Sequence, residues 1–124
     1  MQIHSAVPTF LAPDVAATAR WYAANLGFEI AGHVPKIEPY VYASVMRGPA
    51  EIMLLSMNGY HKPEIQRDGG AWDAYIRIDG VNELYETLKE QPFINMPLEQ
   101  QPYGDWEFEV RDPNGYVLVF GGAY

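Results

Sequence analysis

Cysteine is absent from the sequence, and so are long apolar runs. Without cysteine the chain can form no disulfide, no zinc–thiolate site and no cysteine nucleophile. No apolar run approaches the roughly 18 residues that a membrane span requires. Residues 1–8 also lack the basic and apolar regions of a signal peptide. We therefore expect a cytoplasmic protein that has no membrane partner.

Basic residues are scarce: eight lysines and arginines stand against sixteen aspartates and glutamates, which gives a net charge of −8. Proteins that bind nucleic acid neutralise phosphates with clustered basic side chains, so we expect no nucleic-acid partner. A negative field attracts cationic ligands to a cleft, although the same charge also serves plain solubility. The length of 124 residues and the hydrophobic content of 48% fit one ordinary globular domain.

Two helices are indicated by apolar residues that recur at helical spacing. Asp14 is a good N-cap for the first helix, and Gly27 stands where a C-cap glycine belongs. The apolar face between them consists of Val15, Ala19, Tyr22 and Leu26. The second helix is expected from residue 81 to about residue 90, and its apolar face consists of Val81, Leu84, Tyr85 and Leu88.

Strands are expected between turn signals, of which Asp112-Pro113-Asn114-Gly115 is the strongest. In the first half they cover residues 4–11, 28–34, 40–46 and 51–57. In the second half they cover residues 72–78, 106–111 and 116–120, with an irregular or short edge strand within residues 91–104. The order strand, helix, three strands thus occurs twice, offset by roughly 66 residues.

This repeat predicts an α+β fold built from two βαβββ modules within a single domain, residues 1–124. Module one covers about residues 1–58 and module two about residues 71–124. A linker at about residues 59–70 joins them, and we expect it to be the most mobile segment. Two such halves that face each other would form a cupped mixed sheet with a cavity and with helices on its outer face.

Two motifs resemble those of a known family. DVAATARWY at residues 14–22, followed by Leu26-Gly27-Phe28, resembles the first module of the glyoxalase/bleomycin-resistance/dioxygenase superfamily, whose fold is called vicinal oxygen chelate. FEVRDPNGYVLVFG at residues 108–121 resembles its C-terminal signature. The resemblance covers almost the whole chain and implies the fold. It does not imply one activity, because this fold hosts lyases, isomerases, dioxygenases, epimerases and drug-binding proteins.

The resemblance also implies where a metal would be bound, since catalytic members hold one divalent ion with four side chains. The matching positions in this chain are Val7, Leu54, Asp73 and Val119. Three of these residues are aliphatic and have no lone pair for a metal. Of the three histidines, His4 lies off the register of the first position, and His33 and His61 are expected to be solvated surface residues. We therefore expect no metal and no cofactor, as in the bleomycin-resistance branch, whose members bind a flat, cationic antibiotic as homodimers and catalyse nothing.

A ligand site is expected where strand alternation directs acids and aromatic residues to the face opposite the helices. The candidate ligand-binding residues are Thr9, Tyr42, Leu54, Trp72, Asp73, Tyr75, Arg77, Trp106, Glu107, Glu109 and Val119. Aromatic faces stack on flat rings and attract cations, and carboxylates accept charge-assisted hydrogen bonds. The sequence therefore predicts a small-molecule ligand that is cationic or aromatic, and no catalytic residue.

Structural alternatives stand beside this interpretation. Glu107, Glu109 and Arg111 could form a solvent-facing edge with cross-strand pairs. Asp73 could pair with Arg77 two residues along the same face. Trp72 and Trp106 could serve packing alone, and Tyr40 and Tyr42 could line a dimer seam.

Three functions therefore remain open. The first is a metal-free binding protein that sequesters its ligand. The second is a lyase, isomerase or oxygenase that uses Asp73 with Glu107 or Glu109, since two carboxylates in one cavity can raise each other's pKa. The third is a regulatory or structural interaction domain. In each case we expect a homodimer, because a half-open sheet leaves apolar surface for a partner.

Overall fold

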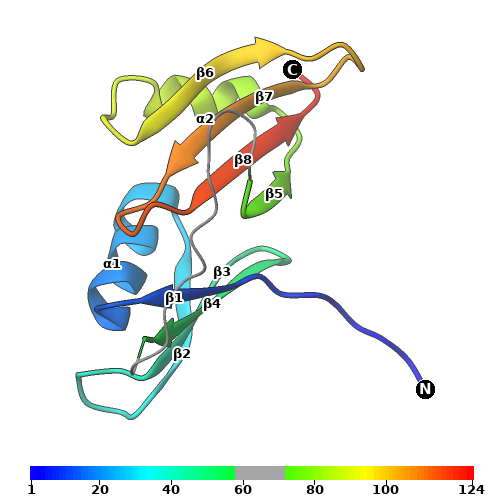
Figure 1. Ribbon diagram of the computed structural model, residues 1–124. Helices are drawn as coiled ribbons and strands as arrows, with labels where there is room; N and C mark the ends of the chain where they lie inside the picture. The colour runs from blue at the N-terminus through cyan, green and yellow to red at the C-terminus, as the bar shows by residue number, and fades with distance from the viewer. Residues whose placement is uncertain (58–71) are drawn as a thin grey trace. The chain divides into compact units, whose positions relative to one another are not determined.

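The computed structural model describes residues 1–57 and 72–124. The chain divides into two compact units, Met1–Ile65 and Gln66–Tyr124, and each has its own four-stranded sheet and helix (Figure 1). The expected linker and His61 lie outside the described residues. In the part of the chain that the structure describes, no helix is long and apolar enough to cross a membrane.

Unit 1 has the order strand, helix, three strands. Its elements are β1 (Thr9–Ala12), α1 (Val15–Leu26), β2 (Glu29–Val34), β3 (Tyr42–Arg47) and β4 (Ala50–Ser56). The sheet order is β1-β4-β3-β2, with β1 parallel to β4 and the other pairs antiparallel. The first strand is shorter than expected, and it begins directly after Pro8, which has no N–H to donate to a ladder.

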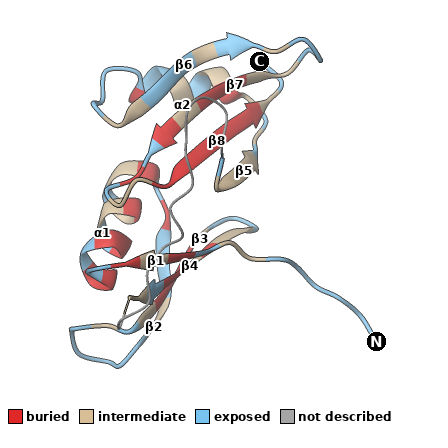
Figure 2. Ribbon diagram, in the orientation of Figure 1, coloured by how far each residue is buried: buried red, intermediate tan, exposed pale blue. Residues whose placement is uncertain are grey.

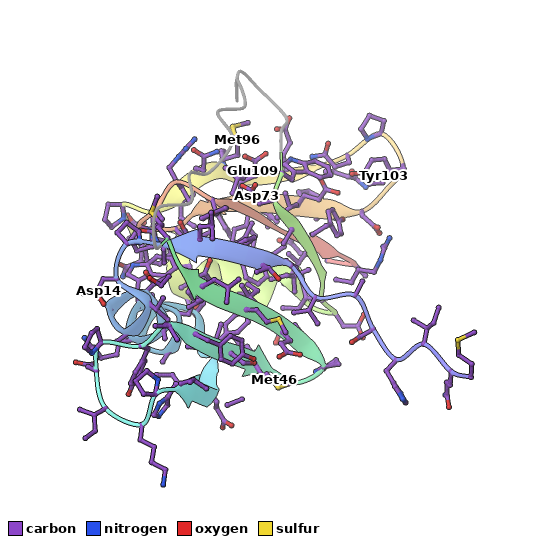
Figure 3. All side chains as sticks on the ribbon, turned by 60° about the horizontal axis from the view of Figure 1, so that its bottom comes forward. Asp14, Met46, Asp73, Met96, Tyr103 and Glu109 are labelled. Atoms are coloured by element: carbon purple, nitrogen blue, oxygen red, sulfur yellow. The ribbon has the colours of Figure 1, made fainter. Side chains whose placement is uncertain are left out.

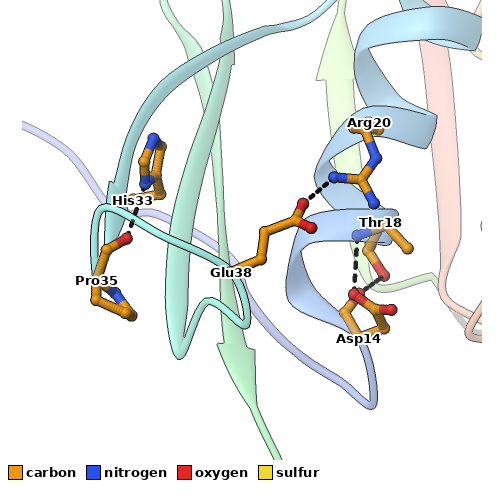
Figure 4. Close-up of polar contacts among 7 residues, drawn as sticks. Asp14, Thr18, Arg20, His33, Pro35 and Glu38 are labelled. Carbon is orange, nitrogen blue, oxygen red and sulfur yellow. Dashed lines mark hydrogen bonds and ion pairs between the residues drawn. The ribbon is translucent and has the colours of Figure 1, made fainter.

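Helix α1 confirms the sequence prediction in detail. The Asp14 side chain accepts a hydrogen bond from the Ala17 N–H at 2.9 Å, and the Thr18 hydroxyl donates to the Asp14 carbonyl at 2.8 Å (Figure 4). The helix ends at Gly27, whose φ of 70° belongs to the left-handed region. The predicted apolar face is fully buried against the sheet.

Unit 2 repeats this order. Its elements are β5 (Ala74–Arg77), α2 (Val81–Leu88), β6 (Ile94–Gln100), β7 (Trp106–Arg111) and β8 (Val117–Gly122). The sheet order is β5-β8-β7-β6, with β5 parallel to β8. The structure therefore confirms the two βαβββ modules. β6 is a seven-residue edge strand where an irregular or short edge strand was expected; it carries Pro97 and two register shifts, both typical of an edge.

Burial differs between the strands of the unit 2 sheet. β7 and β8 hold most of its buried residues, whereas β6 is largely exposed (Figure 2). On one face the Phe108 ring stacks on Phe120 and lies 5.2 Å from the Tyr85 ring of α2. This face is the core beneath the helix. The opposite face carries the polar side chains from which the candidate site is built.

Candidate functional site

Strand register gathers the predicted polar residues on the face of the unit 2 sheet that lies away from α2. Residues directly opposite each other on paired strands point to the same side of the sheet. One row across β5, β8 and β7 consists of Tyr75, Val119 and Glu109. The next row consists of Arg77, Gly121 and Glu107. We call this surface the Glu107 face and define it by these six residues.

Glu107 is the centre of this face. Only 6% of the residue is exposed, and its Oε2 atom accepts hydrogen bonds from two tyrosine hydroxyls. Tyr75 donates from β5 at 2.7 Å. Tyr103 donates from the turn that joins β6 and β7, where Figure 3 labels it. Two neutral donors thus hold a largely buried carboxylate in place, as a buried charge requires.

The second carboxylate oxygen of Glu107 differs from the first. Oε1 accepts no hydrogen bond from the residues that the structure describes. Among those residues no fully buried side-chain oxygen lacks a partner, so Oε1 is not fully buried. The carboxylate therefore has one oxygen that accepts two hydrogen bonds and one that accepts none from the described residues.

Gly121 makes the Tyr75–Glu107 hydrogen bond possible. A methyl group at this position would lie 2.0 Å from the Tyr75 Oη atom, 2.6 Å from its Cζ atom and 3.0 Å from the Glu107 Cγ atom. The φ of Gly121 is not in the left-handed region, so the reason for glycine is space. The tyrosine side chain crosses β8 through the volume that a side chain would fill.

Burial and the hydrogen bonds to Glu107 together raise the pKa of both tyrosines. Burial, followed by the hydrogen bond to Glu107, raises the pKa of Tyr75 well above its ordinary value. The hydrogen bond to Glu107, followed by burial, raises the pKa of Tyr103 to about 12. Both hydroxyls therefore keep their protons and remain donors at neutral pH.

Aromatic surface adjoins the carboxylate. The Trp72 ring lies 5.6 Å from the Tyr75 ring at an interplanar angle of 48°, and 45% of the residue is exposed. The Arg77 guanidinium lies over the Tyr75 ring, 5.4 Å from its centroid. Trp72 precedes β5 instead of beginning it. An exposed indole beside Glu107 offers a flat ligand a surface on which to stack.

A second polar cluster links β6 and β7. The Asn95 side-chain amide donates to Glu109 Oε1 at 2.8 Å. The Asn95 Oδ1 atom accepts from the Arg111 Nε and Nη2 atoms at 3.3 and 3.2 Å. The cross-strand pairing weighed for Glu109 and Arg111 is therefore present, with the amide as intermediary. Glu109 and Arg111 therefore help to join β7 to the edge strand β6. Glu107 instead bonds to Tyr75 and Tyr103.

The structure places three predicted ligand residues elsewhere. The Asp73 Oδ2 atom accepts the Val117 backbone N–H at 2.8 Å, so this carboxylate supports the β5–β8 junction. Trp106 lies in register with Gly122 on the α2 side, and its ring is 4.8 Å from the ring of Tyr124. Leu54 pairs with Phe10 in the buried core of unit 1.

Unit 1 offers a different surface on the face opposite its core. Thr9, Met53 and Ser44 form one row across β1, β4 and β3, and Leu11, Leu55 and Tyr42 form the next. The Ser44 hydroxyl donates to the Glu51 carboxylate at 2.6 Å. The predicted residues Thr9 and Tyr42 thus share a face, and it is more apolar than the Glu107 face.

The surface around β2 and α1 has structural contacts. The His33 ring stacks on Tyr40 with centroids 4.1 Å apart, and its Nδ1 atom lies 2.9 Å from the Pro35 carbonyl oxygen. Arg20 forms an ion pair with Glu38 (Figure 4). His33 is therefore in contact with its neighbours, whereas it was expected to be simply solvated.

The four positions at which the resemblance implies metal ligands do not suit a metal ion. Leu54 is in the core, Val7 and Val119 have no donor atoms, and the Asp73 carboxylate is engaged by a backbone N–H. Register places the thioether of Met53, not Leu54, in the row with Thr9. Across residues 1–57 and 72–124, no three histidine, aspartate or glutamate side chains are close enough to hold a metal ion.

Two residues of the site were not foreseen. Tyr103 lies in the segment that was expected to hold an irregular or short edge strand, and Gly121 was noted only as part of a motif. Tyr103 could have been found from the hairpin between β6 and β7. This hairpin places Tyr103 beside Glu107, which follows it four residues further along the chain. Nothing in the sequence alone indicates that Gly121 accommodates a side chain from another strand.

Comparison with known proteins gives one family and a set of solved structures. A model of the Glyoxalase/Bleomycin resistance protein/Dioxygenase superfamily matches residues 3–120. No curated protein sequence matches the chain. The bleomycin-binding protein of bleomycin-producing Streptomyces verticillus, in complex with copper(II)-bleomycin, is 25% identical, with a TM-score of 0.70 over 100% of this chain and 98% of that one.

Two further structures share the fold at lower identity. TioX from Micromonospora sp. ML1 is 20% identical, with a TM-score of 0.76 over 95% of this chain and 97% of that one. A bleomycin resistance determinant encoded on the transposon Tn5 is 21% identical, with a TM-score of 0.70 over 98% of each chain.

Proposed function

The chain belongs to the glyoxalase/bleomycin resistance protein/dioxygenase superfamily, and from that premise we propose that it is a binding protein for a small cationic or aromatic molecule. It holds its ligand without a metal and without a chemical step, in the manner of the bleomycin-binding members. Bleomycin is one candidate ligand, because a bleomycin-binding protein is among the similar structures.

The observation that carries the proposal is the state of Glu107. A carboxylate that is largely withdrawn from water, held by two hydroxyls and left with one open oxygen attracts a cation more strongly than a surface carboxylate does. The exposed Trp72 ring beside Tyr75 adds a surface for a flat group. The net charge of −8 favours the approach of a positive ligand.

We do not extend the proposal to a reaction. An acid–base pair of Asp73 with Glu107 would need carboxylates that are free to exchange protons with a substrate. The Asp73 carboxylate instead accepts a backbone N–H, and Glu107 accepts two hydroxyls. These contacts suit fixed acceptors and favour binding over proton transfer.

A homodimer is part of the same proposal. Unit 1 exposes large apolar side chains around β2, among them Val34 and Val41, and exposed apolar surface of this kind is commonly buried by a partner. Sedimentation velocity at micromolar concentration is expected to give twice the chain mass, and a monomer there would refute the dimer without affecting ligand binding.

Calorimetric titration of the purified, metal-stripped protein with metal-free bleomycin tests the proposal, and copper(II)-bleomycin serves as a second titrant. Micromolar or tighter binding near one ligand per chain, weakened by added salt, is expected because a charged contact at Glu107 is screened by ions. Mass spectrometry under native conditions, on the purified protein before any metal is stripped, checks whether a metal accompanies it. The absence of heat with both titrants would remove bleomycin as the ligand, and a stoichiometric, tightly bound transition metal would contradict the metal-free function.

A further inference from the structure

The asymmetry of the Glu107 carboxylate bears on which cation it can accept. A carboxylate has about four lone-pair sites, two on each oxygen. Tyr75 and Tyr103 occupy those of Oε2, and Oε1 receives no hydrogen bond from the described residues. In the free protein Glu107 therefore presents one acceptor atom to a ligand instead of two.

Cations differ in how many acceptor atoms they need. Guanidinium and amidinium groups are planar forks that bind best when two parallel N–H bonds reach both oxygens of a carboxylate. An ammonium group is a compact point charge whose three donors rotate, so a single oxygen suffices. A forked cation can make its paired contact with Glu107 only if one tyrosine hydroxyl leaves Oε2.

The two tyrosines are not equally able to leave. Tyr75 crosses the sheet over Gly121 and lies between the Trp72 ring and the Arg77 guanidinium. Tyr103 is 64% exposed, so its side chain can rotate into water. Backbone hydrogen bonds from Gln101 to Asp105 and from Gly104 to Gln101 hold its turn in place, so only the side chain needs to move.

We propose that the Tyr103 hydroxyl makes Glu107 a single-point acceptor, so that the Glu107 face selects primary ammonium ligands over amidinium and guanidinium ligands. This inference rests on the proposed binding function and names the class of cation that the site takes. Tyr103 is then a specificity-determining residue, which acts by competing with the second contact of a forked cation.

The test compares two aromatic cations of similar size, benzylammonium and benzamidinium, by NMR titration of the full chain. The wild-type protein is expected to bind benzylammonium more tightly. In Tyr103→Phe the ring is kept and the competing hydroxyl is lost, so benzamidinium should gain about tenfold in affinity while benzylammonium changes little. Tyr124→Phe is the matched control, because Tyr124 is 67% exposed and lies beside Trp106 on the other face.

The outcomes separate the inference from the proposed function. In one outcome, both cations bind and Glu107→Gln weakens both, but Tyr103→Phe leaves the ratio of benzylammonium to benzamidinium affinity unchanged. That result overturns the selection by Tyr103 and leaves the binding function intact. Failure of both cations to bind the wild type and Tyr103→Phe overturns the binding function of this face, and the inference falls with it. A change of ratio in Tyr124→Phe equal to that in Tyr103→Phe also contradicts the inference.

Discussion

Gly121 is the residue that allows Tyr75 to reach Glu107. In Gly121→Ala the new methyl group would overlap the Tyr75 hydroxyl, so the tyrosine must move and its hydrogen bond to Glu107 is lost. Overpacking of this kind costs about 1–3 kcal/mol in the free energy of unfolding, measured by urea denaturation. Gly32→Ala is the control, since a Cβ there meets nothing within 4 Å. Equal stability changes in the two variants would contradict this role.

The two tyrosines predict a pH dependence at the alkaline end. Their pKa values are raised in the folded protein, so the folded state holds these protons more tightly than the unfolded chain, whose tyrosines ionise near 10. Stability is therefore fully present below pH 10 and falls as the pH rises toward about 12. In the double variant Tyr75→Phe/Tyr103→Phe, urea denaturation from about pH 9 to 11 should show a shallower fall than in the wild type. Parallel curves would show that neither hydroxyl is coupled to folding.

Single residues also show how far the sequence could lead. Alternation correctly placed Tyr75, Arg77, Glu107 and Glu109 on one face, because the strand that begins at Trp106 was located without error. Leu54 was assigned to the wrong face, since a shift of one residue in strand register turns every side chain to the other side. The pairing of β1 with β4, which corrects it, depends on contacts between distant parts of the chain.

At the scale of elements, α1 owes its start to one side chain. Asp14→Ala removes the acceptor of the Ala17 N–H and is expected to lower the free energy of unfolding by about 1 kcal/mol. Asp79→Ala is the matched control: Asp79 is exposed just before α2, and that helix has no side-chain cap at Gly80. The control should stay within about 0.5 kcal/mol of the wild type in thermal or urea unfolding. A larger loss in the control would contradict the capping argument.

Elements differed in how well the sequence predicted them. Helix α1 was fully specified by its cap, its apolar spacing and Gly27, all of which are local. β6 was predicted less sharply, as an irregular or short edge strand, because proline cannot donate to a ladder and the full seven-residue strand depends on pairing with β7. The Tyr103 contact was missed for the same reason, since the hairpin that carries it was not foreseen.

At the scale of the whole molecule, the repeat was the most informative signal. Two βαβββ units followed from the order of elements alone, and the family that hosts this fold followed from two motifs. The hydrogen bonding of Glu107 was less accessible, since it is set by the side chains of Tyr75 and Tyr103, which come from two separate segments.

The central claim is that Glu107 is the anchor for a cationic ligand, and one measurement tests it most directly. The affinity for metal-free bleomycin is compared by calorimetry in Glu107→Gln and in Glu86→Gln. The two variants change the net charge equally, but Glu86 lies exposed on α2 beside Lys89. Glu107→Gln is expected to weaken binding about tenfold or more, since a charge-assisted contact is lost, while Glu86→Gln leaves it nearly unchanged. Equal affinities in both variants would show that the ligand is held elsewhere.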